Sequence, residues 1–191
     1  MSLVQQQYAE LKQVVVSFER FLPQVEKLFP LFEQCFKNGH KVLTCGNGGS
    51  AADALHMAEE LVGRYRGNRR SLPAISLSAD VTALTCIGND WGYDAVFSRQ
   101  IEGLGHAGDI LVIFSGSGNS ANLIKALGAA KKLGIITVSL LGKGGGKARE
   151  LSDHAIVIPT DNTARAQELH TWIMHVILEH IETVYPVVDN I

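Results

Sequence analysis

Short apolar runs alternate with longer helical stretches from Lys41 onward, and this alternation limits the possible folds more than any other feature. Five runs have the character of strands, with no hairpin signal between them: 41–46, 74–78, 109–115, 135–141 and 154–159. Helical patterns separate or follow them: 50–63, 80–86, 94–104, 120–133, 146–151 and 164–185. Because parallel strands need long crossover connections, the pattern predicts a five-stranded parallel sheet in a three-layer α/β/α sandwich.

The segment before the first strand has a different pattern. Residues 3–38 read as helix, and we expect Pro23 and Pro30 to break or kink it into two or three pieces. We predict a helical arm over 1–38 that serves in oligomerisation and an α/β domain over 39–191, as one structural domain overall. An apolar arm of this kind packs either on its own sheet or in a bundle with other copies.

Length and charge exclude several classes of protein. A chain of 191 residues fits one domain, and its net charge of −2 predicts no nucleic-acid partner, since no basic stripe is present. No apolar run approaches the ~20 residues of a membrane span, and no signal peptide is evident, so we expect a cytoplasmic protein with no membrane partner. Three scattered cysteines predict neither disulfides nor a thiolate zinc site, and Cys45 and Cys86 are expected to be buried.

Two glycine-rich loops follow predicted strands. "GNGGSA" (46–51) follows the first and "SGSGNSAN" (115–122) follows the third, where an open parallel sheet binds its ligands. Glycines let the backbone approach an anion, and helix N–H groups point toward it. The first loop lacks the lysine of a P-loop, and no acidic residue stands where a dinucleotide site needs one. We therefore expect a small phosphorylated metabolite, with ordinary turns and caps as the alternative.

Two helices carry groups suited to acid/base or metal chemistry. His56 and Glu60 are four residues apart and share a helix face, as a metal site or acid/base pair requires, although an exposed pair without function is the alternative. We expect Glu59 to point elsewhere, into solvent. Gln167 and His175 share one side of the last helix but are ~12 Å apart along its axis. Because a neighbouring subunit could supply one of them, we expect a site at a subunit interface.

The motifs together resemble the sugar isomerase (SIS) domain and, more narrowly, the bacterial phosphoheptose isomerases. The resemblance covers nearly the whole chain and rests on segments 45–66, 88–90, 105–127, 140–147 and 164–175. It implies a flavodoxin-like parallel sandwich preceded by a helical arm, in a homotetramer with sites between subunits. It also implies isomerisation of the ketose sedoheptulose 7-phosphate to D-glycero-D-manno-heptose 7-phosphate, which feeds ADP-heptose and lipopolysaccharide synthesis.

The resemblance also implies roles for individual residues. One zinc ion per subunit is implied at His56, Glu60, Gln167 and His175. Glu60 and His175 are implied as the acid/base pair of an enediol mechanism, with the serine loop on the phosphate. The residues implied to contact substrate are Asn47, Gly48, Gly49, Ser50, Glu60, Asn89, Asp90, Ser115, Gly116, Ser117, Ser120 and Gln167.

Two positions depart from the family, and two other functions compete. Gly116 stands where the family usually has Thr, which removes one possible phosphate donor, and Ala164 stands where some members have Asp. One competing function is that of a non-catalytic SIS protein that binds a replication initiator; such relatives lack the carboxylate at the position of Glu60. The other is a sugar-phosphate sensor, which needs no acid/base pair, but no basic DNA-binding module fits in the chain.

Overall fold

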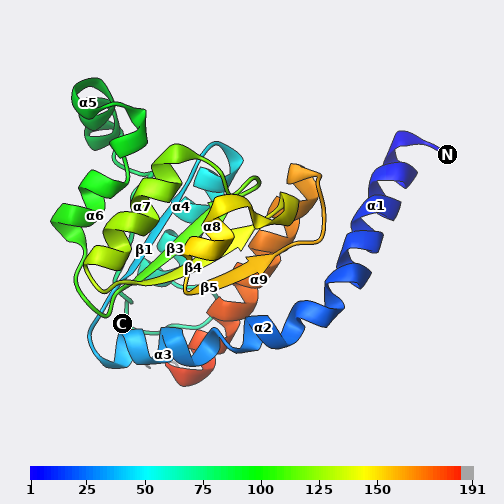
Figure 1. Cartoon of the computed structure of the whole chain (residues 1–191). Coiled ribbons are helices and arrows are strands. Elements are labelled where there is room, and N and C mark those ends of the chain that lie inside the picture. The colour runs from blue at the N-terminus through cyan, green and yellow to red at the C-terminus, as the bar shows by residue number, and fades with distance from the viewer. Residues whose placement is uncertain (186–191) are drawn as a thin grey trace.

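The five predicted strands form one parallel sheet, which confirms the expected fold. The computed structural model describes residues 1–185, so 186–191, the end of the predicted domain 39–191, lie outside the described residues. The strands are β1 (Val42–Gly46), β2 (Ala74–Ser76), β3 (Ile110–Ser115), β4 (Ile136–Leu141) and β5 (His154–Val157). Their order in the sheet is β2-β1-β3-β4-β5, and every neighbouring pair is parallel (Figure 1).

The predicted helices are present, with ends that move by a few residues. They are α1 (Leu3–Phe18), α2 (Leu22–Glu26), α3 (Phe29–Lys37), α4 (Gly49–Val62), α5 (Val81–Trp91), α6 (Ser98–Leu104), α7 (Ala121–Lys132), α8 (Gly146–Leu151) and α9 (Thr163–Val184). Pro23 and Pro30 each lie in the first turn of a helix, α2 and α3. Proline is favoured there because its missing N–H has no partner inside the helix. These prolines therefore start new helices and divide the arm as predicted.

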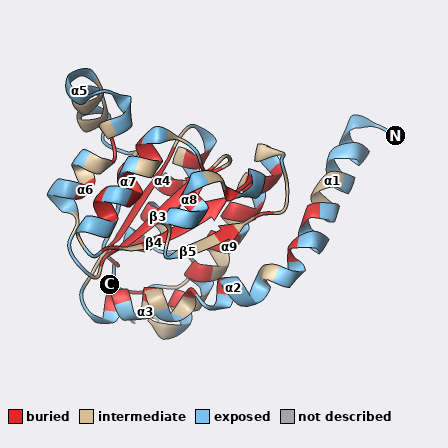
Figure 2. Ribbon diagram, viewed as in Figure 1, coloured by how far each residue is buried: buried red, intermediate tan, exposed pale blue. Residues whose placement is uncertain are grey.

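The sheet separates two hydrophobic layers. Along β3, Ile110, Val112 and Phe114 belong to the layer that contains α4, α9 and the arm. Leu111 and Ile113 belong to the opposite layer, with α6, α7 and α8. Successive side chains of a strand point to opposite faces, so a strand covered on both sides is apolar throughout. Figure 2 shows the resulting buried strands between the helices.

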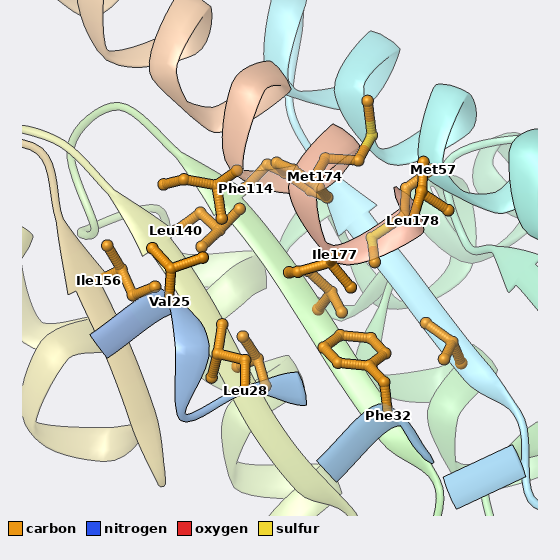
Figure 3. Packing of buried hydrophobic residues seen from close by; sticks show 14 of the residues in the cluster. Val25, Leu28, Phe32, Met57, Phe114, Leu140, Ile156, Met174, Ile177 and Leu178 are labelled. Atoms are coloured by element: carbon orange, nitrogen blue, oxygen red, sulfur yellow. The ribbon is translucent and has the colours of Figure 1, made fainter. Parts of the chain in front are cut away.

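The arm packs on its own chain from the second half of α1 onward, whereas the start of α1 exposes apolar side chains. Val25, Leu28 and Phe32 lie in the same core cluster as Ile177 and Leu178 of α9 (Figure 3). By contrast, α1 runs away from the body of the molecule (Figure 1), and its first turns expose Leu3, Val4 and Tyr8. Packing on its own sheet is therefore seen for the second half of the arm, and packing in a bundle with other copies stays a prediction for the first. The division at residue 38 stays a prediction.

Helix α5 also stands out from the body (Figure 1). It contains no buried residue, although Asp80 caps it by accepting hydrogen bonds from Thr82 N and Ala83 N. The expectation that Cys86 is buried is wrong: α5 packs on the layer of α6 and α7 through Leu84 and Ile87, while Cys86 is exposed. Cys45 in β1 is buried as expected. Within residues 1–185, no helix is both long and apolar enough to cross a bilayer.

Candidate active site

A cavity opens at the point in the sheet where the order in which the strands are added reverses. β1 and β3 are neighbours, while the chain leaves them toward opposite edges of the sheet, and such switch points are where open α/β sheets bind ligands. The cavity has a volume of about 210 Å³. Its lining residues are Asn47, Ser50, Phe114, Ser115, Gly116, Ser117, Ser120, Leu123, Thr163 and Gln167. The structure thus brings together residues of both predicted loops and Gln167 of the last helix.

Three helices begin at this cavity. Ser50 lies in the first turn of α4, Ser120 is the N-cap residue of α7, and Thr163 is the first residue of α9. Helix N-termini carry partial positive charge and unpaired N–H groups, which favour an anion. No side chain of Lys, Arg, Asp or Glu is among the lining residues. The cavity therefore suits an anion held by hydroxyls, amides and helix dipoles.

The serine loop is held rigidly at the end of β3. The Ser115 hydroxyl oxygen accepts a hydrogen bond from Gly118 N at 3.0 Å. Gly118 has a φ of +64°, and a β-carbon there would overlap the carbonyl oxygen of Gly145. The segment "GKGGGK" (142–147) contains the 3₁₀ turn Lys143–Gly145 and lies directly against the serine loop. Glycines on both sides permit this close approach.

The first loop is tied to the second by amide side chains. Asn47 Nδ2 donates to Asn122 Oδ1 at 3.0 Å, and Asn122 Nδ2 donates to Asn47 Oδ1 at 2.9 Å. Tyr93 Oη donates to the same Asn47 oxygen at 2.9 Å. The positive φ of Gly48, +58°, lets the loop turn into α4. Asn122 and Tyr93 are not among the predicted site residues, because their contacts join positions that are distant in sequence.

Gln167 lines the same cavity as the two glycine-rich loops. Its Nε2 donates to Ser50 Oγ at 3.3 Å, and a β-carbon on Gly49 would lie 2.6 Å from the same nitrogen. Gly49 is therefore needed for the amide of Gln167 to cover the start of α4.

A second group of polar side chains lies farther along α4 and α9. His56 Nε2 is 3.2 Å from Glu60 Oε1, and the rings of His56 and His175 have centroids 5.2 Å apart in an edge-on arrangement. A carboxylate oxygen of Glu59 also lies within 4.8 Å of the ligand atoms of His56 and Glu60. The expectation that Glu59 points elsewhere is wrong, because residues i, i+3 and i+4 share one helix face; its exposure is as expected.

The surroundings of His175 favour its neutral form. Burial lowers the pKa of His175, and the charges of His56 and Arg66 lower it further, while Glu60 raises it. The Tyr65 ring lies beside the imidazole, with centroids 5.4 Å apart. A neutral imidazole can both accept and donate a proton, as an acid/base group must.

A buried ion pair fixes α4 relative to α9 at this end. Glu182 accepts hydrogen bonds from Tyr65 N, Arg66 N and Gly67 N at 2.9–3.1 Å. The Arg69 guanidinium, whose side chain is 1% exposed, lies 3.6 Å from Glu182 and donates to the carbonyls of Glu60 and Leu61. These contacts tie the end of α4, where Glu60 sits, to the helix that carries His175.

The donor set of this second group fits a zinc ion. Imidazole nitrogens and carboxylate oxygens are ligands that zinc binds. His56, Glu59 and Glu60 bring such atoms within 4.8 Å of one another, and the His175 ring lies beside His56 but outside this cluster. Gln167, the fourth predicted ligand, contacts Gly49 and Ser50 in the cavity instead. On a straight helix it is ~12 Å from His175. The four-residue ligand set therefore stays a prediction that one described chain does not assemble.

Asn89 and Asp90 lie outside the cavity. They occupy the last turn of α5, exposed to solvent, and Asn89 Nδ2 donates to Asp90 Oδ1 at 2.8 Å. Their predicted contact with substrate requires another subunit or a movement of α5, and it stays a prediction.

Comparison with known proteins agrees with this geometry. The SIS domain model matches residues 7–142, and the chain belongs to the SIS domain family. Within that family it is similar to several phosphoheptose isomerases. That of Campylobacter jejuni is 46% identical over 181 residues, 95% of this chain and 97% of the relative. That of Sulfurimonas denitrificans is 49% identical over 173 residues, 91% and 89% of the two chains.

Solved structures show the same relationship. The phosphoheptose isomerase of Neisseria gonorrhoeae has a TM-score of 0.89 at 40% identity, over 94% of this chain and 97% of that one. The enzyme of Francisella tularensis also reaches 0.89, at 30% identity, over 96% of this chain and 100% of that one. The chain is thus a member of the phosphoheptose isomerase group of SIS proteins, in both sequence and fold.

Proposed function

We propose that this protein is an aldose–ketose isomerase that converts sedoheptulose 7-phosphate to D-glycero-D-manno-heptose 7-phosphate. The observation that carries the proposal is the pairing of an anion cavity at the switch point with the His56, Glu60 and His175 group on two of the same helices. The relatives named phosphoheptose isomerase support the same activity.

The chemistry follows from the two ends of the site. The phosphate of the open-chain ketose binds in the cavity, near Ser115, Ser117 and Ser120. The Glu60 carboxylate takes a proton from C1, and the electron pair forms the C1–C2 double bond of an enediol while O2 gains a proton. His175, which supplies the proton to O2, then takes the proton from O1, and the protonated Glu60 returns a proton to C2, which gives the aldose. Atoms and charge balance, since one proton leaves C1 and one arrives at C2.

One zinc ion per subunit is part of the proposal, with His56, Glu60 and His175 as ligands and Gln167 as the fourth. When bound, zinc polarises the substrate carbonyl and stabilises the negative oxygen that develops. The protein groups orient the reacting carbons by fixing both helices through Arg69 and Glu182.

A homotetramer with sites between subunits is also proposed. It is supported by the exposed apolar side chains of α1, and by the end of α5 and the turn after it, which present Trp91 and Tyr93 to solvent beside Asn89 and Asp90. The proposed location is the cytoplasm and the proposed pathway is that of ADP-heptose and lipopolysaccharide; free thiols at Cys35, Cys45 and Cys86 fit a reducing compartment.

The test of this function is direct. Purified protein is incubated with sedoheptulose 7-phosphate, and the products are followed by NMR. We expect heptose 7-phosphate from the wild type, none from Glu60→Gln, and a mass in solution of four chains. A folded wild-type protein that binds the ketose phosphate without forming product would contradict the proposed activity.

A further inference from the structure

The cavity contains a threonine that the sequence motifs do not indicate. Thr163, the first residue of α9, lines the cavity together with Ser115, Ser117 and Ser120. A β-carbon on Gly116 would lie 2.6 Å from Thr163 Cγ2 and 3.1 Å from its hydroxyl oxygen. Contacts this short between carbons are repulsive, so the Thr163 side chain occupies the space that a side chain at position 116 would need.

The Thr163 hydroxyl is not required to cap its own helix. Asn162 is the N-cap residue of α9, and its Oδ1 accepts the hydrogen bond from Ala164 N at 3.0 Å. Asn162 is itself held by Glu10 and by the hydroxyl of Thr160. Because Asn162 already provides the capping hydrogen bond at the start of α9, the Thr163 hydroxyl can donate into the cavity that it lines.

Hydroxyl donors matter in this cavity because no cationic side chain lines it. The Ser120 hydroxyl makes no capping bond to α7, and the Ser115 hydroxyl accepts from Gly118 N while keeping its own hydrogen for a ligand. A hydrogen bond from a neutral donor to a charged group is stronger than one between neutral groups. One additional hydroxyl in such a set therefore has a measurable effect on the affinity for a phosphate dianion.

We propose that the Thr163 hydroxyl binds the phosphate group of the substrate, in the space that a threonine at position 116 would otherwise fill. Glycine at position 116 then does not leave the phosphate site with one hydrogen-bond donor fewer. The hydroxyl comes instead from the first turn of α9, and Gly116 is required because Thr163 is present. This inference deepens the proposed function and rests on it for the identity of the substrate, but not for the binding of phosphate.

The experiment exchanges the two positions. Thr163→Val keeps the shape of the side chain and removes the hydroxyl, and Thr163→Ser keeps the hydroxyl. Gly116→Thr is made alone and together with Thr163→Ala. Dissociation constants for inorganic phosphate and for sedoheptulose 7-phosphate are measured by titration calorimetry, and thermal unfolding shows that each variant is folded.

We expect Thr163→Val to weaken both ligands about tenfold or more and Thr163→Ser to stay within about threefold of the wild type. Gly116→Thr alone should lose affinity, and the double variant should recover most of it. Wild-type affinity in Thr163→Val would overturn the proposal, as would a Gly116→Thr variant that binds as well as the double variant. Because inorganic phosphate is not turned over, its affinities test the role of Thr163 even if the wild type is inactive, whereas an inactive wild type would contradict the proposed function alone.

Discussion

The two ends of the candidate site are built in different ways. The anion cavity is made mostly of backbone turns and short side chains at the starts of α4, α7 and α9, and its residues meet within one chain. The group of His56, Glu60 and His175 consists of long side chains on helix surfaces, where they are partly exposed. The cavity is therefore fixed by the fold itself, whereas the acid/base end depends on how two helices are held.

The difference also shows in what each end lacks. Within residues 1–185, the cavity assembles both predicted loops with Gln167. At the other end Gln167 does not join His56 and Glu60, and Asn89 and Asp90 lie on the projecting α5. This comparison suggests a division that can be tested: the anion cavity is complete within a single chain, whereas the predicted ligands and contacts at the acid/base end are not all brought together in it.

The largest effect is expected from Glu60→Gln, which removes the proposed base. We expect kcat to fall by about 10²–10⁴-fold with little change in the affinity for inorganic phosphate, because the cavity is separate. Steady-state kinetics and titration calorimetry measure the two quantities. Glu59→Gln is the matched control, since it removes a carboxylate from the same helix face, and we expect it to change kcat by less than about tenfold. Equal losses of kcat in the two variants would contradict the assignment of Glu60 as the base.

Metal removal should separate the two ends in the same way. Treatment with a chelator should abolish turnover, and added zinc should restore it, because the proposed ligands lie at the acid/base end. The affinity for inorganic phosphate should be unchanged, since no proposed ligand except Gln167 lines the cavity. Full activity of chelated, metal-free protein, verified by metal analysis, would show that zinc is not needed.

A smaller effect, on stability, is expected from Gly118→Ala. Gly118 has a positive φ, and an added β-carbon would overlap Gly145 O, so we expect a loss of about 2–3 kcal/mol in the free energy of unfolding. The control is Gly128→Ala in α7, where the added carbon meets open space and helix propensity predicts a gain of about 0.5–1 kcal/mol. Denaturant titration measures both changes; effects of the same sign would contradict the described loop.

The smallest effect is expected from Glu182→Gln, which breaks the ion pair with Arg69. Burial raises the pKa of Glu182, but the N–H groups of Gly67, Arg66 and Tyr65 and the charge of Arg69 outweigh it, so the pKa lies below its ordinary value of 4.5. Its contribution to stability is therefore complete above about pH 4.5 and disappears as the pH falls through the lowered pKa.

We expect Glu182→Gln to cost about 1–2 kcal/mol at pH 7, with a difference from the wild type that narrows below pH 4.5. The exposed Glu179, which pairs with Arg66 on the same helix, gives the control Glu179→Gln, for which we expect at most about 0.5 kcal/mol. Unfolding measured across pH tests both. A difference that widens toward acid would mean that the carboxylate is not stabilised in its ionised form.

The sequence predicts the sheet and the cavity well because their signals are local. A buried parallel strand such as Ile110–Ser115 is apolar throughout, and the glycine loop after it identifies the edge that binds ligands. Helix ends were predictable to within a few residues for the same reason, as Pro23 and Pro30 illustrate.

Contacts between distant segments could not be predicted in this way. Thr163 gives no signal of its own, because its role depends on the absence of a side chain at Gly116, which is far away in the sequence. The Arg69–Glu182 pair joins a loop to the far end of α9, and the exposure of Cys86 depends on which face of α5 meets the body of the molecule. Such features follow from packing, which only the fold determines.

The most direct test of the central claim is an NMR experiment in D₂O with sedoheptulose 7-phosphate, in which wild-type protein is compared with Glu60→Gln. The account predicts heptose 7-phosphate that carries deuterium at C2 from the wild type, because the enediol exchanges its proton with solvent. It predicts neither product nor exchange at C1 from Glu60→Gln, although phosphate still binds. Product without deuterium, or exchange that persists in Glu60→Gln, would contradict proton transfer by Glu60 through an enediol.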